Sequence, residues 1–138
     1  MSAAEFLDTN VLVYAYDRSD PRKQKIARDL VLRAVAGEIA ASSQVLGEFA
    51  STMLHKVNPA VKPSDLAALL GTLGPIHLIP LDGDVVLRAV RAHAQYGLHF
   101  YDGMIVAAAE RGGCQKIWSE DLNAGQEYFG VKVENPFV

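Results

Sequence analysis

Four acidic residues that lie far apart in the sequence have the types and positions needed for phosphate-ester chemistry. Asp8 ends a short apolar run, Glu48 lies just over one turn into a predicted helix, and Asp102 begins a helix of small residues. Asp121 follows the predicted strand that ends at Trp118. In an open parallel sheet the ligand crevice lies beyond the carboxyl ends of the strands. We therefore expect these four carboxylates to converge at one edge of the sheet.

Carboxylates brought together in this way raise one another's pKa unless a positive charge compensates them. No lysine or arginine lies within three residues of any of the four acids. An all-oxygen ligand set suits a hard divalent cation, so the sequence predicts Mg²⁺, with Mn²⁺ as the other candidate. Zinc is not indicated, because the four histidines have no metal-site spacing with Cys114. In phosphodiester hydrolysis a divalent ion activates water and neutralises the developing charge.

The elements that must position these acids are short apolar runs alternating with helices. Predicted strands end at Asp8 and cover residues 38–41, 76–79, 114–118 and 130–137, whereas residues 11–16 fit a strand or a helix. Predicted helices begin after Asp20, after Ser42 or Ser43, at Pro63, after Asp82 or Asp84, and at Asp102, and glycines or Asn58-Pro59 end them. The alternation predicts an α/β fold, a three-layer α/β/α sandwich around a central, mainly parallel sheet.

Length and composition exclude several classes of protein. The chain has 138 residues, 50% hydrophobic and 21% charged, which fits a single domain over residues 1–138 rather than a disordered or fibrous chain. No apolar run reaches the roughly 20 residues of a membrane helix, and the N-terminus does not resemble a secretory signal. The single cysteine, Cys114, excludes an internal disulfide and is expected to be buried. We therefore expect a cytoplasmic protein with no membrane association.

The charge distribution indicates one candidate nucleic-acid surface. The net charge of −3 argues against a protein that coats nucleic acid by bulk electrostatics. Six of the 13 basic residues nevertheless lie between Arg18 and Arg33, against two acids. A basic stripe can track phosphates, although charge runs are more commonly solvated helix faces. The candidate RNA contacts are Arg18, Arg22, Lys23 and Lys25.

Several segments resemble the successive motifs of a known family. FLDTNVLVYAYD, SSQVLGEF, YDGMIVAAAERGG, IWSEDLNAGQ and VENPF, in this order from Phe6 to the C-terminus, are similar to the motifs of PIN domains. They most resemble VapC-type ribonuclease toxins of prokaryotic toxin–antitoxin pairs. One departure is Gly103, where many relatives carry Ala. The resemblance covers essentially the whole chain.

The resemblance implies a function and a set of site residues. It implies a metal-dependent endoribonuclease, commonly a homodimer, that is inhibited by a small antitoxin protein. The catalytic acids would be Asp8, Glu48, Asp102 and Asp121, of which Asp8, Asp102 and Asp121 would bind the metal. Asn10 and Ser119 fall where the family has polar residues that help to hold the first and fourth acids.

Two other functions stay open. An aspartate-based, phosphatase-like enzyme could use Asp8 as its nucleophile, but the general acid expected two residues on is replaced by Asn10. A catalytically silent PIN-fold module would keep the acids and bind RNA or a protein, for example on the apolar helices around Met53 and residues 66–73. Glu120 adds a fifth acid beside Asp121, and we expect its side chain to face solvent.

Overall fold

A mainly parallel sheet organises the part of the chain that the structure describes, residues 4–138 of a computed structural model. Its six strands follow the order β3–β2–β1–β4–β6–β5. They are β1 (Glu5–Leu7), β2 (Ile39–Ser42), β3 (Leu78–Ile79), β4 (Lys116–Trp118), β5 (Glu127–Tyr128) and β6 (Val131–Glu134). Neighbouring strands pair in parallel except β5, which is antiparallel to β6. The predicted α/β class is confirmed.

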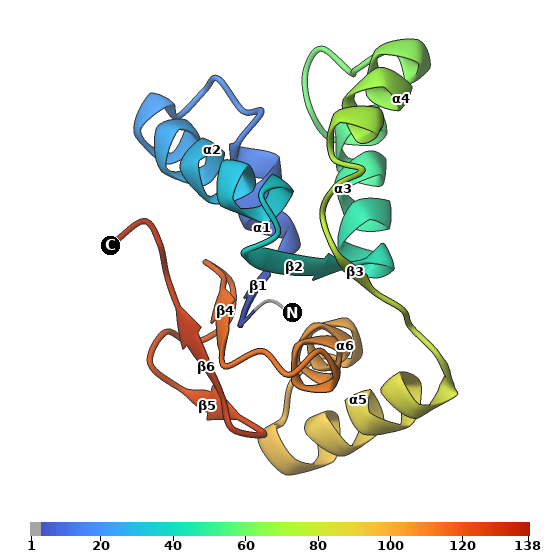
Figure 1. The fold of residues 1–138 in the computed structure, drawn as a ribbon, viewed down its shortest axis with the longest axis vertical. Helices are drawn as coiled ribbons and strands as arrows, with labels where there is room; N and C mark the ends of the chain where they lie inside the picture. The colour runs from blue at the N-terminus through green and yellow to red at the C-terminus, as the bar shows by residue number, and fades with distance from the viewer. Residues whose placement is uncertain (1–3) are drawn as a thin grey trace.

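Helices cover both faces of this sheet (Figure 1). Within residues 4–138 they are α1 (Thr9–Tyr14), α2 (Pro21–Val35), α3 (Ser43–His55), α4 (Pro63–Thr72), α5 (Gly83–Tyr96) and α6 (Phe100–Arg111). On one side α1 packs against α2 and α3, with α4 beside α3, and on the other side α5 packs against α6. This arrangement confirms the predicted three-layer sandwich.

Side-chain caps determine where several helices begin. Asp20 accepts a hydrogen bond from the backbone amide of Lys23 (3.1 Å), at the start of α2. Ser42, the first of the two candidate serines, accepts one from the amide of Val45 (3.3 Å) at the start of α3. Asp82 caps α5 in the same way. Each cap satisfies amide groups that have no partner inside the helix, so these positions follow directly from the sequence.

The register of β1 and β4 brings two distant segments to the same edge of the sheet. Leu7 pairs with Trp118, and the amide of Asp8 donates to the carbonyl oxygen of Trp118 (3.0 Å). Asp8 and Ser119, the residues that follow, therefore leave the sheet side by side. The α3 helix starts from the end of β2, on the other side of β1.

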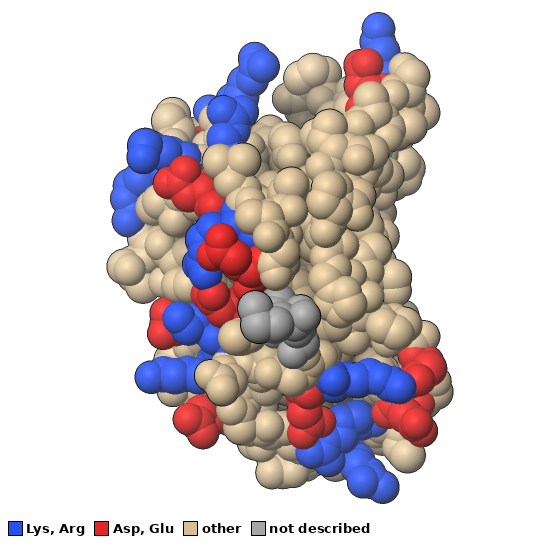
Figure 2. Space-filling view, viewed as in Figure 1, with Lys and Arg blue, Asp and Glu red and all other residues tan. Residues whose placement is uncertain are grey.

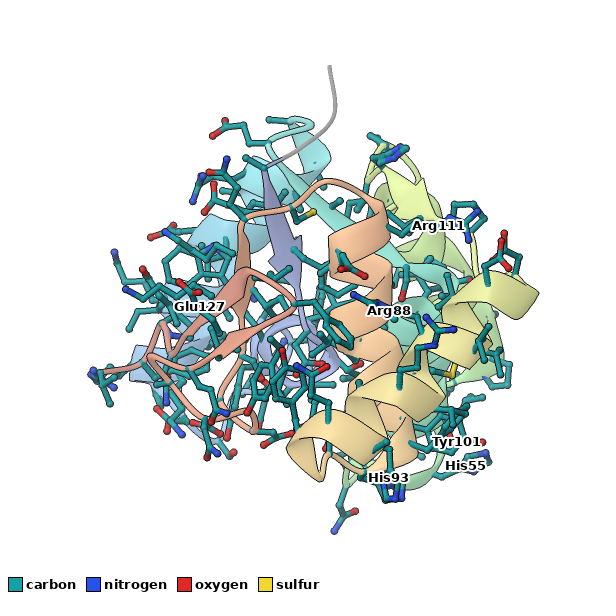
Figure 3. The ribbon with its side chains drawn as sticks, turned by 90° about the horizontal axis from the view of Figure 1, so that it is seen from below. His55, Arg88, His93, Tyr101, Arg111 and Glu127 are labelled. Carbon is teal, nitrogen blue, oxygen red and sulfur yellow. The ribbon has the colours of Figure 1, made fainter. Side chains whose placement is uncertain are left out.

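The α6 helix is buried along most of its length, including every residue from Gly103 to Ala109. An added Cβ at Gly103 would lie 2.8 Å from the carbonyl oxygen of Ala89, so the glycine allows α5 to approach α6 closely. Arg88 extends from α5 toward α6 (Figure 3) and donates two hydrogen bonds to Glu110, of 2.8 and 2.9 Å. These contacts fix the helix that carries Asp102.

Three local features differ from or resolve the sequence predictions. The ambiguous segment 11–16 belongs mainly to helix α1, which Asp8 caps by accepting a hydrogen bond from the amide of Thr9. The α6 helix begins at Phe100, two residues earlier than predicted, so Asp102 lies inside its first turn. Strand β5 was not predicted, because two residues are too few for a recognisable alternation of polar and apolar side chains.

Two smaller predictions concern burial and length. Cys114 is buried as expected, although it lies just before β4 rather than within it. Among the described residues, the structure contains no helix with the length and hydropathy needed to cross a membrane.

Candidate active site

All four predicted carboxylates line one cavity of about 500 Å³ at the carboxyl end of the central strands. Asp8 follows β1, and Asp121 lies in the loop after β4. Glu48 comes from the second turn of α3, and Asp102 comes from the first turn of α6. Residues that are up to 113 positions apart, from Asp8 to Asp121, thus face the same space.

Asp8 is the buried centre of this site, with 5% of its surface exposed. One carboxylate oxygen accepts a hydrogen bond from the amide of Thr9 (2.7 Å). The other accepts from the Ser119 hydroxyl (2.6 Å) and the Asn10 side-chain amide (3.2 Å). Burial raises the pKa of Asp8 to about 6; the hydrogen bonds from Ser119 and Thr9 oppose this rise, and the neighbouring carboxylates add to it. Its hydrogen-bond partners within residues 4–138 are all neutral.

Asn10 and Ser119 join the first and fourth acids. The Asn10 side-chain amide also donates to Asp121 (3.1 Å), while its oxygen accepts from the backbone amide of Glu120 (3.0 Å). Besides donating to Asp8, the Ser119 hydroxyl accepts from the backbone amides of Asp121 and the next residue, both at 3.2 Å. Asn10 and Ser119 thus link Asp8 to the segment that carries Asp121 by hydrogen bonds.

The other two acids differ in how firmly they are held. The hydroxyl of Thr9 donates to Glu48 (2.7 Å), which fixes this exposed carboxylate at the rim of the cavity. Asp102 is partly buried, and its carboxylate accepts no hydrogen bond from residues 4–138. Partial burial is the main reason that the pKa of Asp102 is raised; His99 lowers it, and the nearby carboxylates raise it further.

The expectation that Glu120 faces solvent is wrong. The Tyr14 hydroxyl donates to one Glu120 oxygen (2.7 Å), and Lys23 forms an ion pair with the other. Burial acts to raise the pKa of Glu120, but the hydrogen bonds from Lys23 and Tyr14 outweigh it and hold the pKa below its ordinary value. Because Asn10 also holds the backbone amide of Glu120, this network fixes the loop that carries Asp121.

The predicted basic stripe is divided by this network. Lys23 is engaged with Glu120, and Lys25 lies 3.9 Å from Asp29 in an exposed ion pair. Arg22 donates to the backbone carbonyl of Phe137. Of the four candidate RNA contacts, Arg18 is exposed and has neither an ion pair nor a hydrogen bond from its side chain within residues 4–138.

Comparison with known proteins identifies the fold family. The family model described as the PIN domain matches residues 6–126. The chain belongs to the PIN domain family. No curated protein matches the sequence of this PIN domain.

Solved structures share the fold of this PIN domain at low sequence identity. A chain of a toxin–antitoxin complex from Klebsiella pneumoniae superposes with a TM-score of 0.69 at 19% identity, covering 96% of this chain and 97% of that chain. A chain of DNA-bound VapBC from Salmonella typhimurium gives 0.68 at 16% identity, over 97% and 98%. VapC20 of Mycobacterium tuberculosis, a toxin that cleaves the sarcin–ricin loop, gives 0.65 at 18% identity, over 85% and 91%.

The donor set of this PIN domain suits a hard divalent cation. Six carboxylates and one lysine line the cavity, and its other polar groups are hydroxyls and an amide. Within the described chain, no group of three or more acidic, histidine or cysteine side chains is placed to hold a metal ion by itself. Mg²⁺ commonly binds proteins through one or two carboxylates and keeps several water ligands. The oxygen donors therefore fit an ion that retains much of its hydration.

Sequence reasoning missed the roles of three residues that shape the site. Thr9 fixes Glu48, and Tyr14 and Lys23 fix Glu120. Thr9 could have been noticed, because it lies between two predicted site residues in the DTN triplet. No local pattern links Lys23 to Glu120, since 97 positions separate them in the sequence.

Proposed function

We propose that this PIN domain is a metal-dependent endoribonuclease that hydrolyses RNA phosphodiester bonds, and that it is the toxin of a toxin–antitoxin pair. The observation that carries the proposal is the buried carboxylate of Asp8, which faces three further carboxylates and is held by neutral donors within residues 4–138. Such a site favours binding of an external cation. Family membership and the likeness to toxin–antitoxin structures, and to a toxin that cleaves the sarcin–ricin loop, also support it.

Each residue has a proposed role. Of Asp8, Asp102 and Asp121, one or two would bind Mg²⁺ or Mn²⁺ directly and the others would hold it through its water ligands; the ion, when bound, supplies water activation and stabilises charge on the phosphate. Ser119 and Asn10 orient Asp8 and Asp121 by hydrogen bonds to their oxygens. Glu48, which Thr9 orients at the exposed rim, would accept a proton from the attacking water.

Cleavage of RNA tests this proposal. Total cellular RNA would be incubated with the wild type and with Asp102→Asn, each with and without Mg²⁺ or Mn²⁺. Asp65→Asn is the matched control, because Asp65 is an exposed acid on α4 outside the cavity. We expect cleavage that requires metal, is lost in Asp102→Asn and persists in Asp65→Asn. Equal cleavage by Asp102→Asn would refute the assignment of the acids.

A second candidate function, a PIN module that binds RNA or protein without cleaving, is favoured by one observation. The carboxylates share a cavity but do not form a closed ligand group within residues 4–138. Metal-dependent RNA binding by a folded wild type that leaves every RNA intact would select this alternative.

The proposal includes an antitoxin partner, a homodimer and a cytoplasmic location. Charged side chains gather over α2 and the outer strands and over α5, whereas the surface along α3 and α4 carries few of them (Figure 2). Leu54, Leu69 and Leu70 on these two helices are only partly buried. This surface is the region where we expect a partner subunit or antitoxin to pack. Met53 is buried, so Met53→Glu would test the core rather than this contact.

A further inference from the structure

A second cavity of about 620 Å³ adjoins the acidic one. The two cavities share Asp17 and Lys56 in their walls and therefore adjoin at these residues. The second cavity lies between the segment after α1, which includes Tyr16 and Arg18, and the segment after α3, which includes Asn58. Its volume is in the range of small-ligand sites.

The second cavity contains cations that are available to an external anion. Six basic side chains in residues 4–138 form ion pairs: Lys23, Lys25, Arg33, Arg88, Arg111 and Lys116. Arg22 and Arg28 donate instead to backbone carbonyls. The exposed side chains of Arg18 and Lys56 have neither kind of partner among the described residues. Both line the second cavity.

The other polar and aromatic groups of this cavity are compatible with a nucleotide. The one acid in its wall, Asp17, accepts hydrogen bonds from the amide and hydroxyl of Ser19 (2.9 and 2.6 Å), which hold its carboxylate locally. The ring of Tyr16 packs against Phe49, with the ring centres 5.5 Å apart, and Tyr16 is only partly buried. A partly exposed aromatic ring gives a base a surface on which to stack.

Electrostatics explains why a nuclease would need such a neighbour. A strand of RNA placed in the first cavity would bring its phosphates toward six carboxylates and a single lysine. That lysine, Lys56, together with Arg18 of the adjoining cavity would attract the next phosphates of the strand and hold it against this repulsion.

We propose that Arg18 and Lys56 bind backbone phosphates of a single RNA strand that runs from the acidic cavity into the second cavity. This subsite rests on the proposed nuclease function, because it takes the strand whose phosphodiester bond lies at the acids. A base of the same strand lies over Tyr16. The substrate is accordingly unpaired on one side of the cleaved bond.

The salt dependence of RNA binding tests the subsite. Binding of labelled oligouridine would be followed by fluorescence anisotropy over a range of KCl at fixed Mg²⁺, in an Asp102→Asn background that prevents cleavage. The double variant Arg18→Gln/Lys56→Gln is compared with the control Arg91→Gln/Lys132→Gln. The control removes two exposed cations that line neither cavity and form no ion pair with residues 4–138. Each phosphate contact of a single strand contributes about 0.7 to the slope of log K against log salt.

We expect Arg18→Gln/Lys56→Gln to reduce the magnitude of this slope by about 1.4, and Arg91→Gln/Lys132→Gln to leave the slope unchanged. Equal slopes in the two double variants would overturn the subsite. For binding of a blunt RNA duplex, we expect the two double variants to have the same slope. If Arg18→Gln/Lys56→Gln reduces the slope for the duplex as much as for oligouridine, the assignment to a single strand is overturned.

The outcomes also separate the subsite from the nuclease. If the wild type cleaves RNA but the slopes are equal, the subsite is wrong and the nuclease stands. If the slope falls as expected while the wild type cleaves no RNA, the subsite stands in a protein that only binds RNA.

Discussion

Replacement of Asp8 by Asn is expected to make the free energy of unfolding fall less as the pH rises. Burial raises the pKa of Asp8 from 3.8 to about 6, so the folded chain binds more protons at this position than the unfolded chain between these values. The free energy of unfolding therefore falls as the pH rises through this window. At about 1.4 kcal/mol for each pKa unit, the full effect is about 3 kcal/mol, of which about 2 kcal/mol falls between about pH 4.5 and pH 7.5.

Asp8→Asn removes this ionisation but keeps the shape of the side chain. The amide cannot accept all the hydrogen bonds that Thr9, Asn10 and Ser119 donate to the carboxylate, and each lost bond costs about 1 kcal/mol at every pH. The informative quantity is therefore the difference in unfolding free energy between the variant and the wild type, measured by urea titration at several pH values without divalent metal.

We expect this difference to shift in favour of Asp8→Asn by about 2 kcal/mol from about pH 4.5 to pH 7.5. The control Asp65→Asn, at an exposed acid of α4, should show no such shift. Added Mg²⁺ should stabilise the wild type at the higher pH, because a ligand that binds only the folded chain raises its stability, and should not stabilise Asp8→Asn. A difference that stays constant with pH would refute the account of Asp8 as a buried carboxylate held ionised at a cost.

Two further variants test the helices and the loop around the site. Gly103→Ala should lower the unfolding free energy by about 1 to 2 kcal/mol, because overpacking against the Ala89 carbonyl outweighs the gain in helix propensity. Gly47→Ala, where an added Cβ meets open space in α3, should raise it by up to about 1 kcal/mol in the same urea titration. Glu120→Gln should cost about 1 kcal/mol and reduce RNA cleavage less than Asp102→Asn, since it loosens the Asp121 loop but leaves the acids in place. Asp29→Asn, which breaks an exposed ion pair, should cost less than about 0.5 kcal/mol and leave cleavage unchanged.

Most of the fold could be predicted from the sequence because its signals are local. Asp20 followed by Pro21 fixes the start of α2, and Gly97, with a φ of 71°, ends α5 in a left-handed conformation that glycine adopts without strain. Residues 11–16 were ambiguous because a short, wholly apolar run fits a strand and a helix equally well. The cap that Asp8 provides decides in favour of α1, but the same residue was also a candidate site acid.

The sequence could predict which acids share the site, but it could not predict the hydrogen bonds and ion pairs that hold them. Convergence of the four acids follows from the predicted parallel direction of the strands, because parallel strands present their carboxyl ends at one edge. The roles of Lys23 and Glu120 depend on which surface of α2 meets the loop after β4, and no spacing rule gives that contact. For the same reason the sequence indicated Lys23 as an RNA contact and did not single out Lys56, which lines both cavities.

Binding of Mn²⁺ reports on the four acids as a metal site without requiring the correct RNA. Free Mn²⁺ would be followed by electron paramagnetic resonance during titration of the wild type, Asp8→Asn and the control Asp65→Asn near neutral pH. We expect saturable binding of Mn²⁺ by the wild type and by Asp65→Asn, which Mg²⁺ displaces and which Asp8→Asn loses. Binding that is unchanged in Asp8→Asn, or no binding by the folded wild type, would contradict this expectation.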